Sequence, residues 1–241
     1  MSSNTKTTSK VDKNSSKTGK AFWGPPTWFL IHVLAASLQP KNSEAYKTML
    51  HSLTKLLPCI RECRANLKLK LQILPPDDYM KNSEDAFFYS YTLHDMANQQ
   101  ISIAHPDTPK DSPNYDKIRK YYFDGLAEEG NEFWENHMWF VIHALATTLR
   151  PEDALAYKQF LFSIAKLVPC ENMKKTLESS LKMMPPDAYL SNNHDAFFYS
   201  YVLHDIANSK SRVNSESLQN YDDMKSYYFR ALFQECNECS V

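Results

Sequence analysis

The sequence is poor in glycine, cysteine and long apolar runs, and neither sign of charge predominates. Its 241 residues include 4 glycines and 5 cysteines, and the glycine content is well below the usual ~7%. Scarce glycine, with no sustained alternation of apolar and polar residues, disfavours strands and favours helices. The 27 basic and 28 acidic residues give a net charge of −1. Composition therefore gives no reason to expect a nucleic-acid or membrane-surface partner.

The sequence also lacks a run long enough to cross a bilayer and the apolar segment of a secretory signal. Residues 1–20 are mostly Ser, Thr, Lys and Asn, and we expect a disordered tail because so few apolar groups cannot offset the entropy of ordering. This tail has no Arg and no amphipathic face, which argues against a mitochondrial presequence. We expect a cytoplasmic protein.

The sequence contains an internal repeat of two copies. Aromatic, histidine and cysteine positions of the first copy return 111 positions later: Phe22-Trp23, Trp28, His32 and Pro58-Cys59 recur as Phe133-Trp134, Trp139, His143 and Pro169-Cys170. The segment Asp85 to Tyr91 returns 110 positions later as Asp195 to Tyr201. Two long copies indicate a duplicated domain and not a solenoid. We expect modules over residues 21–130 and 131–235, followed by a C-terminal tail at 236–241.

Each copy is predicted to be a five-helix bundle, which makes the fold class all-α. In the first copy we expect a helix from just after Pro26 to about residue 37, where Pro40 follows, and further helices at about 43–57, 58–74, 82–100 and 114–129. In the second copy the expected helices lie near 137–149, 153–168, 170–183, 193–209 and 219–235.

The cysteines form two close pairs and one single residue. Cys59 and Cys63 lie near the predicted start of the third helix, where backbone N–H groups and the helix dipole lower the pKa of a thiol. Cys236 and Cys239 lie near the C-terminus, and Cys170 has no obvious partner because Lys174 replaces the second cysteine of its pair. Close pairs indicate redox or metal chemistry. A zinc site built from both pairs is an alternative, although they lie at opposite ends of the chain.

Aromatic and imidazole side chains share faces of the predicted first and fourth helices. Trp28 and His32 are four residues apart, as are His94 and Asn98, so each pair projects from one side of a helix. Such groups facing one bundle interior would suit a flat, redox-active ligand. The alternative is that these Trp and His residues are ordinary core residues.

In their order and spacing these residues resemble the Erv/ALR-type FAD-dependent sulfhydryl oxidases, in which a five-helix module holds FAD beside a Cys-x-x-Cys pair. The resemblance covers residues 22–100 and includes Trp23-Gly24, Thr27-Trp28, His32, the dithiol, His94 and Asn98. It implies that Trp23, Gly24, Thr27, Trp28 and His32 contact the flavin from the first helix. It further implies that His94 and Asn98 hold the adenosine part of FAD.

By the same resemblance Cys63 is the flavin-proximal thiol, and Cys59 exchanges with incoming thiols. The expected reaction forms disulfides in protein dithiols, or in a thioredoxin-like relay, and passes the electrons to oxygen to give hydrogen peroxide. Members of the family often carry a shuttle dithiol on a terminal segment, which is the role implied for Cys236 and Cys239. Their modules tend to dimerise, so the two copies are expected to form an intramolecular pseudo-dimer, with homo-oligomers also open.

Two departures from the family pattern affect these expectations. Three residues separate Cys59 from Cys63 where the family has two. Positions four apart in a regular helix are too distant for a disulfide, so Cys59 must lie outside the regular helix or the first turn must be distorted.

The second copy departs at more positions. The possible second FAD site comprises Trp134, Trp139, His143, His204 and Asn208, but Glu135 replaces Gly24 and Met138 replaces Thr27. We expect the second copy to be inactive as an oxidase.

Two other functions stay open, namely a flavin-binding pseudoenzyme that acts as a scaffold and a cofactor-free structural protein. For the location, a viral or virion-associated setting and the mitochondrial intermembrane space are alternatives within the family resemblance.

Overall fold

The computed structural model describes residues 17–104, 106–107, 110–211 and 219–233. In the first copy the helices are α1 (Gly19–Ala36), α2 (Ser43–Leu56), α3 (Glu62–Ile73), α4 (Ser83–Ala104) and α5 (Tyr115–Glu128). In the second they are α6 (Asn131–Thr147), α7 (Ala154–Leu167), α8 (Glu171–Met183), α9 (Asn193–Ser211) and α10 (Tyr221–Phe233). Short 3₁₀ turns lie at η1 (Pro40–Asn42), η2 (Asp77–Tyr79), η3 (Pro151–Asp153) and η4 (Pro186–Tyr189). The described residues form no strand, and the all-α prediction is confirmed.

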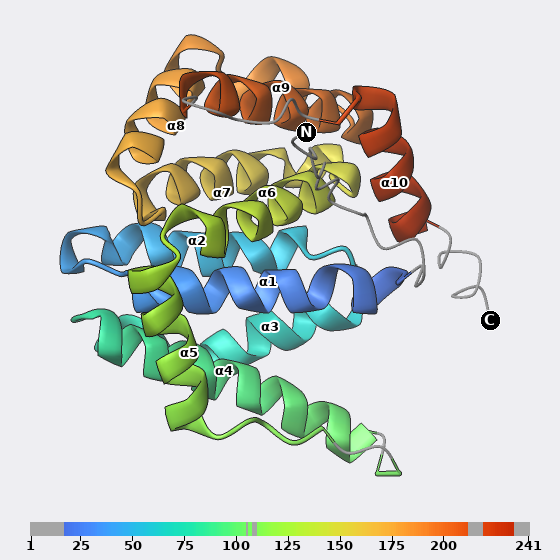
Figure 1. Ribbon diagram of the computed structural model, residues 1–241. Coiled ribbons are helices and arrows are strands. Elements are labelled where there is room, and N and C mark those ends of the chain that lie inside the picture. The colour runs from blue at the N-terminus through green and yellow to red at the C-terminus, as the bar shows by residue number, and fades with distance from the viewer. Residues whose placement is uncertain (1–16, 105, 108–109, 212–218, 234–241) are drawn as a thin grey trace, which may run out of the picture.

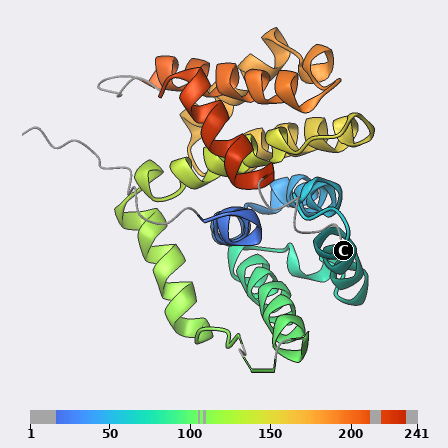
Figure 2. The same cartoon turned by 90° about the vertical axis from the view of Figure 1, so that its right-hand side faces the viewer.

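The helices stack in layers, with the two copies in contact through their first two helices (Figure 1). α2 packs against α7 and α1 against α6. α3 and α4 cover the outer side of the first pair, and α8 and α9 cover the outer side of the second. The fifth helix of each copy contacts the first helix of both copies, because α5 contacts α1 and α6, and α10 contacts α6 and α1 (Figures 1 and 2).

The core is built from the apolar faces of α1, α2, α6 and α7. Val33 and Leu34 of α1 and Met49 of α2 are fully buried. In each copy a tyrosine of the second helix is hydrogen-bonded to the first helix. The hydroxyl of Tyr46 in α2 donates to the carbonyl of Ile31 in α1 at 3.0 Å. Tyr157 does the same to Ile142 at 3.1 Å. None of the described helices combines the length and hydrophobicity needed to cross a membrane.

The first helix of each copy begins six residues or more before the predicted start. α1 begins at Gly19 and contains Pro25 and Pro26 in its interior, and α6 begins at Asn131. Proline removes a backbone hydrogen bond, but the added turns bury Phe22 and Trp23 to 5% and 6% exposure. Burial of these rings therefore outweighs the local signal from proline. Residues 1–16 of the expected tail lie outside the described residues, and its last two residues are helical.

The third helix begins later than predicted. α3 starts at Glu62, so Cys59 lies in the turn before the helix and Cys63 lies in its first turn. The predicted start at Pro58-Cys59 was therefore wrong. A disulfide between cysteines with three intervening residues requires Cys59 to lie outside the regular helix, and the structure places it there.

Candidate redox and flavin site

The dithiol is held at the N-terminus of α3. The backbone N–H of Cys63 donates to Sγ of Cys59 over 3.3 Å, and Glu62 provides a second backbone N–H. The side chain of Cys63 also donates to Cys59, and this interaction is the main cause that lowers the pKa of Cys59 to about 6. Lys20 of α1 contributes a smaller favourable charge. The reduced pair thus carries its thiolate on Cys59 at neutral pH.

Cys63 keeps its proton in this arrangement. The same interaction raises the pKa of its thiol, and burial acts in the same direction. Both thiols are half-buried and unbridged. The sequence interpretation assigned the thiolate that donates electrons to Cys63, whereas the geometry of the reduced pair stabilises the negative charge on Cys59.

The second group of candidate residues joins α1 to α4. The rings of Trp28 and His94 stack with centroids 4.1 Å apart and planes 5° apart. Nε2 of His32 lies 3.0 Å from Nδ1 of His94, and Nδ1 of His32 lies 2.9 Å from the hydroxyl of Ser90. The structure thus brings together the predicted Trp28, His32 and His94, and adds a serine that sequence reasoning missed.

The hydroxyl of Ser90 fixes the protonation of both imidazoles. It donates its proton to the carbonyl of Phe87 over 2.8 Å, so its oxygen accepts from Nδ1–H of His32. Nε2 of His32 is then unprotonated and accepts from Nδ1–H of His94. Burial lowers the pKa of His32 to about 3, aided by His94, and lowers that of His94 to about 4, aided by Lys110. Both rings are neutral at pH 7.

The remaining candidates of the first copy lie around this pair. Asn98 is 8% exposed and its amide donates to the hydroxyl of Ser112 at 3.1 Å. The hydroxyl of Thr27 donates to the carbonyl of Trp23 at 2.7 Å, which places Thr27 in a structural contact within α1. Trp23 is buried, and a Cβ at Gly24 would meet only Lys20, at 3.8 Å.

A cavity of about 80 Å³ opens beside the imidazoles, and His32, His94, Asn98, Asp95 and Tyr122 are among its lining residues. Stacking rings, neutral imidazoles and an amide are groups that can hold the ring systems of a flavin dinucleotide. Because cofactor sites usually measure roughly 300–1,000 Å³, the chemistry of the site fits FAD while its open volume requires side chains to separate.

The second copy repeats the histidine arrangement in a more closed form. His143 lies 3.0 Å from His204 and 2.8 Å from Ser200, and Trp139 stacks on His204 at 4.2 Å. Trp139 is 2% exposed, whereas Trp28 is partly exposed.

Glu135, at the position of Gly24, occupies part of this closed region. Burial raises the pKa of its carboxyl, and the indole N–H of Trp139 opposes that rise. The indole nitrogen is nevertheless buried without a well-formed hydrogen bond. Trp134 is 1% exposed, Met138 is fully buried in place of Thr27, and Asn208 is partly buried.

A larger cavity, of about 380 Å³, lies between the N-terminal part of α1, α6 and α10. Its lining includes Phe22, Phe29, His137 and Arg230, and none of the candidate flavin or thiol residues. No metal-binding group of three or more His, Cys, Asp or Glu residues exists within the described ranges, which leave out Cys236 and Cys239.

The fold and site thus define an all-helical protein with a polarised dithiol at one helix start and an aromatic–histidine site between α1 and α4. Residues 25–119 match the model of the Erv1 / Alr family. The matched segment contains both Cys59 and Cys63 and ends before the second copy begins. No curated protein and no solved structure matches the chain.

Proposed function

We propose that this protein is an FAD-linked sulfhydryl oxidase whose first copy carries the redox site, and that it oxidises protein dithiols and passes electrons to oxygen to give hydrogen peroxide. The observation that supports this most directly is the position of Cys59 before α3, within reach of Cys63 despite the extra residue. The match of residues 25–119 to the model of the Erv1 / Alr family supports the cofactor and the class of reaction.

The thiol exchange follows from the properties of Cys59. A substrate thiolate attacks Sγ of Cys59 in the oxidised Cys59–Cys63 pair, the S–S bond breaks, and Cys63 takes the electron pair. The second substrate thiolate attacks the mixed disulfide, releasing Cys59 and completing the substrate disulfide. A leaving thiol of low pKa departs faster, and Cys59 has a pKa of about 6. Two electrons and two protons pass from the substrate dithiol to the cysteine pair.

The residues proposed to hold FAD are those of α1 and α4: Trp23, Gly24, Thr27, Trp28, His32, His94 and Asn98. FAD supplies the two-electron acceptor that connects the dithiol to oxygen. The neutral His32 and His94 and the amide of Asn98 provide hydrogen-bonding groups without charge. Since Glu135 and Met138 fill the corresponding region of the second copy, we propose one flavin per chain.

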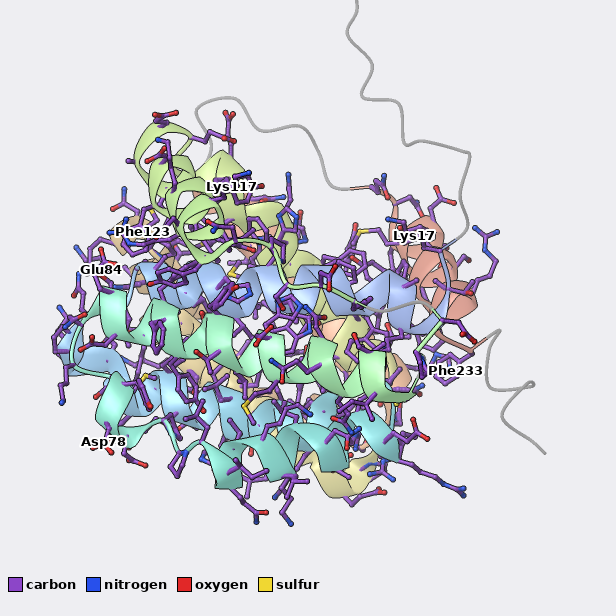
Figure 3. The ribbon with its side chains drawn as sticks, turned by 90° about the horizontal axis from the view of Figure 1, so that it is seen from below. Lys17, Asp78, Glu84, Lys117, Phe123 and Phe233 are labelled. Atoms are coloured by element: carbon purple, nitrogen blue, oxygen red, sulfur yellow. The ribbon has the colours of Figure 1, made fainter. Side chains whose placement is uncertain are left out.

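We also propose that Cys236 and Cys239, which lie outside the described residues, shuttle electrons from substrates to Cys59. α10 packs on α1, and Lys17 and Phe233 lie at the same end of the molecule (Figure 3). Cys239→Ser is expected to slow oxidation of a protein dithiol while leaving dithiothreitol oxidation unchanged. Equal losses on both substrates would exclude the shuttle.

The test of the whole proposal is the visible spectrum of the purified protein, with flavin quantified per chain after denaturation, followed by dithiothreitol oxidation in air. About one flavin and turnover with peroxide release support the oxidase. Flavin without turnover would indicate the scaffold pseudoenzyme. No flavin after incubation with FAD would indicate a structural helical protein. For the location, we propose the cytoplasm, including a viral or virion-associated setting, or alternatively the mitochondrial intermembrane space.

A further inference from the structure

We propose that Asp153 of the second copy is a positioning residue for the redox site, acting through Arg64 to hold the turn that presents Cys59. This inference rests on the proposed function of the dithiol. It assigns a task to the copy that has lost the redox pair.

The contact is a buried ion pair between the copies. Arg64 directly follows Cys63 in α3, and its Nη1 donates to Oδ2 of Asp153 over 2.7 Å. Both side chains are 8% exposed. Asp153 ends η3, and its carboxylate also accepts from Arg150 at 3.0 and 3.1 Å. The second copy therefore fixes the Arg64 guanidinium with a carboxylate that is itself fixed.

The same guanidinium closes the turn that carries Cys59. Nε of Arg64 donates to the carbonyl of Leu57 at 2.7 Å, and Leu57 caps the C-terminus of α2. Arg64 thus ties the residue before Pro58-Cys59 to the residue after Cys63. Because three residues separate the thiols, the position of Cys59 depends on this turn and not on a regular helix.

The two copies differ at this contact, and they also differ in where the next helix begins: α3 begins three residues after Cys59, whereas α8 begins directly after Cys170. The residue equivalent to Asp153 is Asn42, whose amide donates to the carbonyl of Lys166 at 3.0 Å in an exposed position. The residue equivalent to Arg64 is Lys175, which is exposed. The copy with two thiols thus receives a buried ion pair from the other copy. The copy with the single Cys170 receives an exposed hydrogen bond from an amide.

The geometry of arginine explains why this pair suits the task. A guanidinium presents several donors in a rigid plane, so it can serve a carbonyl and a carboxylate at fixed angles. A buried ion pair adds little net stability compared with an apolar pair, and specificity of geometry is the better reason to retain one.

The experiment compares Asp153→Asn and Arg64→Lys with Asn42→Ala in the full chain. Asp153→Asn gives the residue found at the equivalent position of the first copy, and Arg64→Lys retains charge but not the planar fork. After checking the fold by circular dichroism, we would measure the pH midpoint of Cys59 alkylation. We would then measure the rate at which Cys63 displaces glutathione from a Cys59–glutathione mixed disulfide, which releases glutathione and forms the Cys59–Cys63 bond.

We expect both test variants to slow this ring closure about tenfold, because small displacements of reacting groups have large effects on rate. We also expect the alkylation midpoint to rise from about pH 6 as the N–H groups of Glu62 and Cys63 lose their alignment with Cys59. Asn42→Ala should change neither. Folded Asp153→Asn and Arg64→Lys variants with wild-type closure rate and midpoint would overturn the proposal. Neither measurement needs flavin or oxygen. The role of Asp153 is therefore tested separately from the proposed oxidase activity.

Discussion

The two copies share a histidine network and differ in what surrounds it. His32, His94 and Ser90 have the same contacts as His143, His204 and Ser200, within 0.1 Å for the distances between their paired atoms. The tryptophan next to the network is partly exposed in the first copy and 2% exposed in the second. The geometry that both copies share therefore includes a hydrogen-bonded network that links two helices of each bundle, and the proposed flavin site depends on the residues that differ around it.

The strongest distinction between the copies is the second cysteine. Cys63→Ser is expected to lower dithiothreitol oxidation at least about a hundredfold while flavin stays bound, because the electron path needs both thiols. Cys170→Ser, the control in the second copy, should leave turnover unchanged. Oxygen consumption measured for both variants checks this, and wild-type turnover in Cys63→Ser would refute the assignment of the redox pair.

The histidine networks predict that both copies lose stability in acid. Burial holds the pKa of His32 and His204 at about 3 and that of His94 at about 4, below the unfolded value of 6.5. The unfolded chain therefore binds more protons as pH falls from 6.5 toward 4, and the stability present above pH 6.5 is progressively lost.

We expect the free energy of unfolding to fall by at least about 2 kcal/mol between pH 7 and pH 5. Urea denaturation at both pH values measures this change. His94→Gln and His204→Gln should each reduce the dependence on pH, and an effect from only one of them would show that the two networks are not equivalent.

Residue 24 tests why the second copy is closed. Gly24→Glu introduces the residue that the second copy has at position 135, and the added carboxylate would occupy space beside Trp28. Flavin affinity is expected to fall at least about tenfold, or ~1.4 kcal/mol. Glu135→Gly should leave the flavin content at one per chain. Flavin release during dialysis gives both results, and undiminished affinity in Gly24→Glu would show that residue 24 does not distinguish the copies.

The smallest expected difference concerns Lys20, whose equivalent in the second copy is Asn131. Lys20 contributes the weakest of the influences that lower the pKa of Cys59. Since single charges near the surface are screened by water, Lys20→Asn should raise the alkylation midpoint of Cys59 by less than roughly half a pH unit. Asn131→Lys serves as the control without effect. A larger rise would mean that Lys20 makes a direct contact with the thiolate.

Much of this comparison could be predicted from the sequence because helical periodicity places Trp28 with His32 and His94 with Asn98. The repeat also indicated which residues to compare. The start of α1 could not be predicted, since burial of Phe22 and Trp23 outweighed the proline signal. The start of α6, which contains no proline, was also placed too late.

Other parts of the site depend on contacts between distant segments. Ser90 lies in the repeated segment Asp85 to Tyr91, so the repeat could have indicated it, but its partner His32 lies 58 positions away. The Arg64–Asp153 pair joins residues 89 positions apart and gives no local signal. The distribution of protons within the dithiol required the coordinates of its backbone donors.

The contact of α1 and α2 with α6 and α7 has a consequence for how this protein can vary. Where two identical subunits meet about a twofold axis, any substitution occurs on both sides of the interface. Here Asn42 and Asp153 occupy corresponding places and are encoded separately. One side of the interface can thus change without the other, which gives a single chain access to asymmetric solutions that a symmetric dimer does not have.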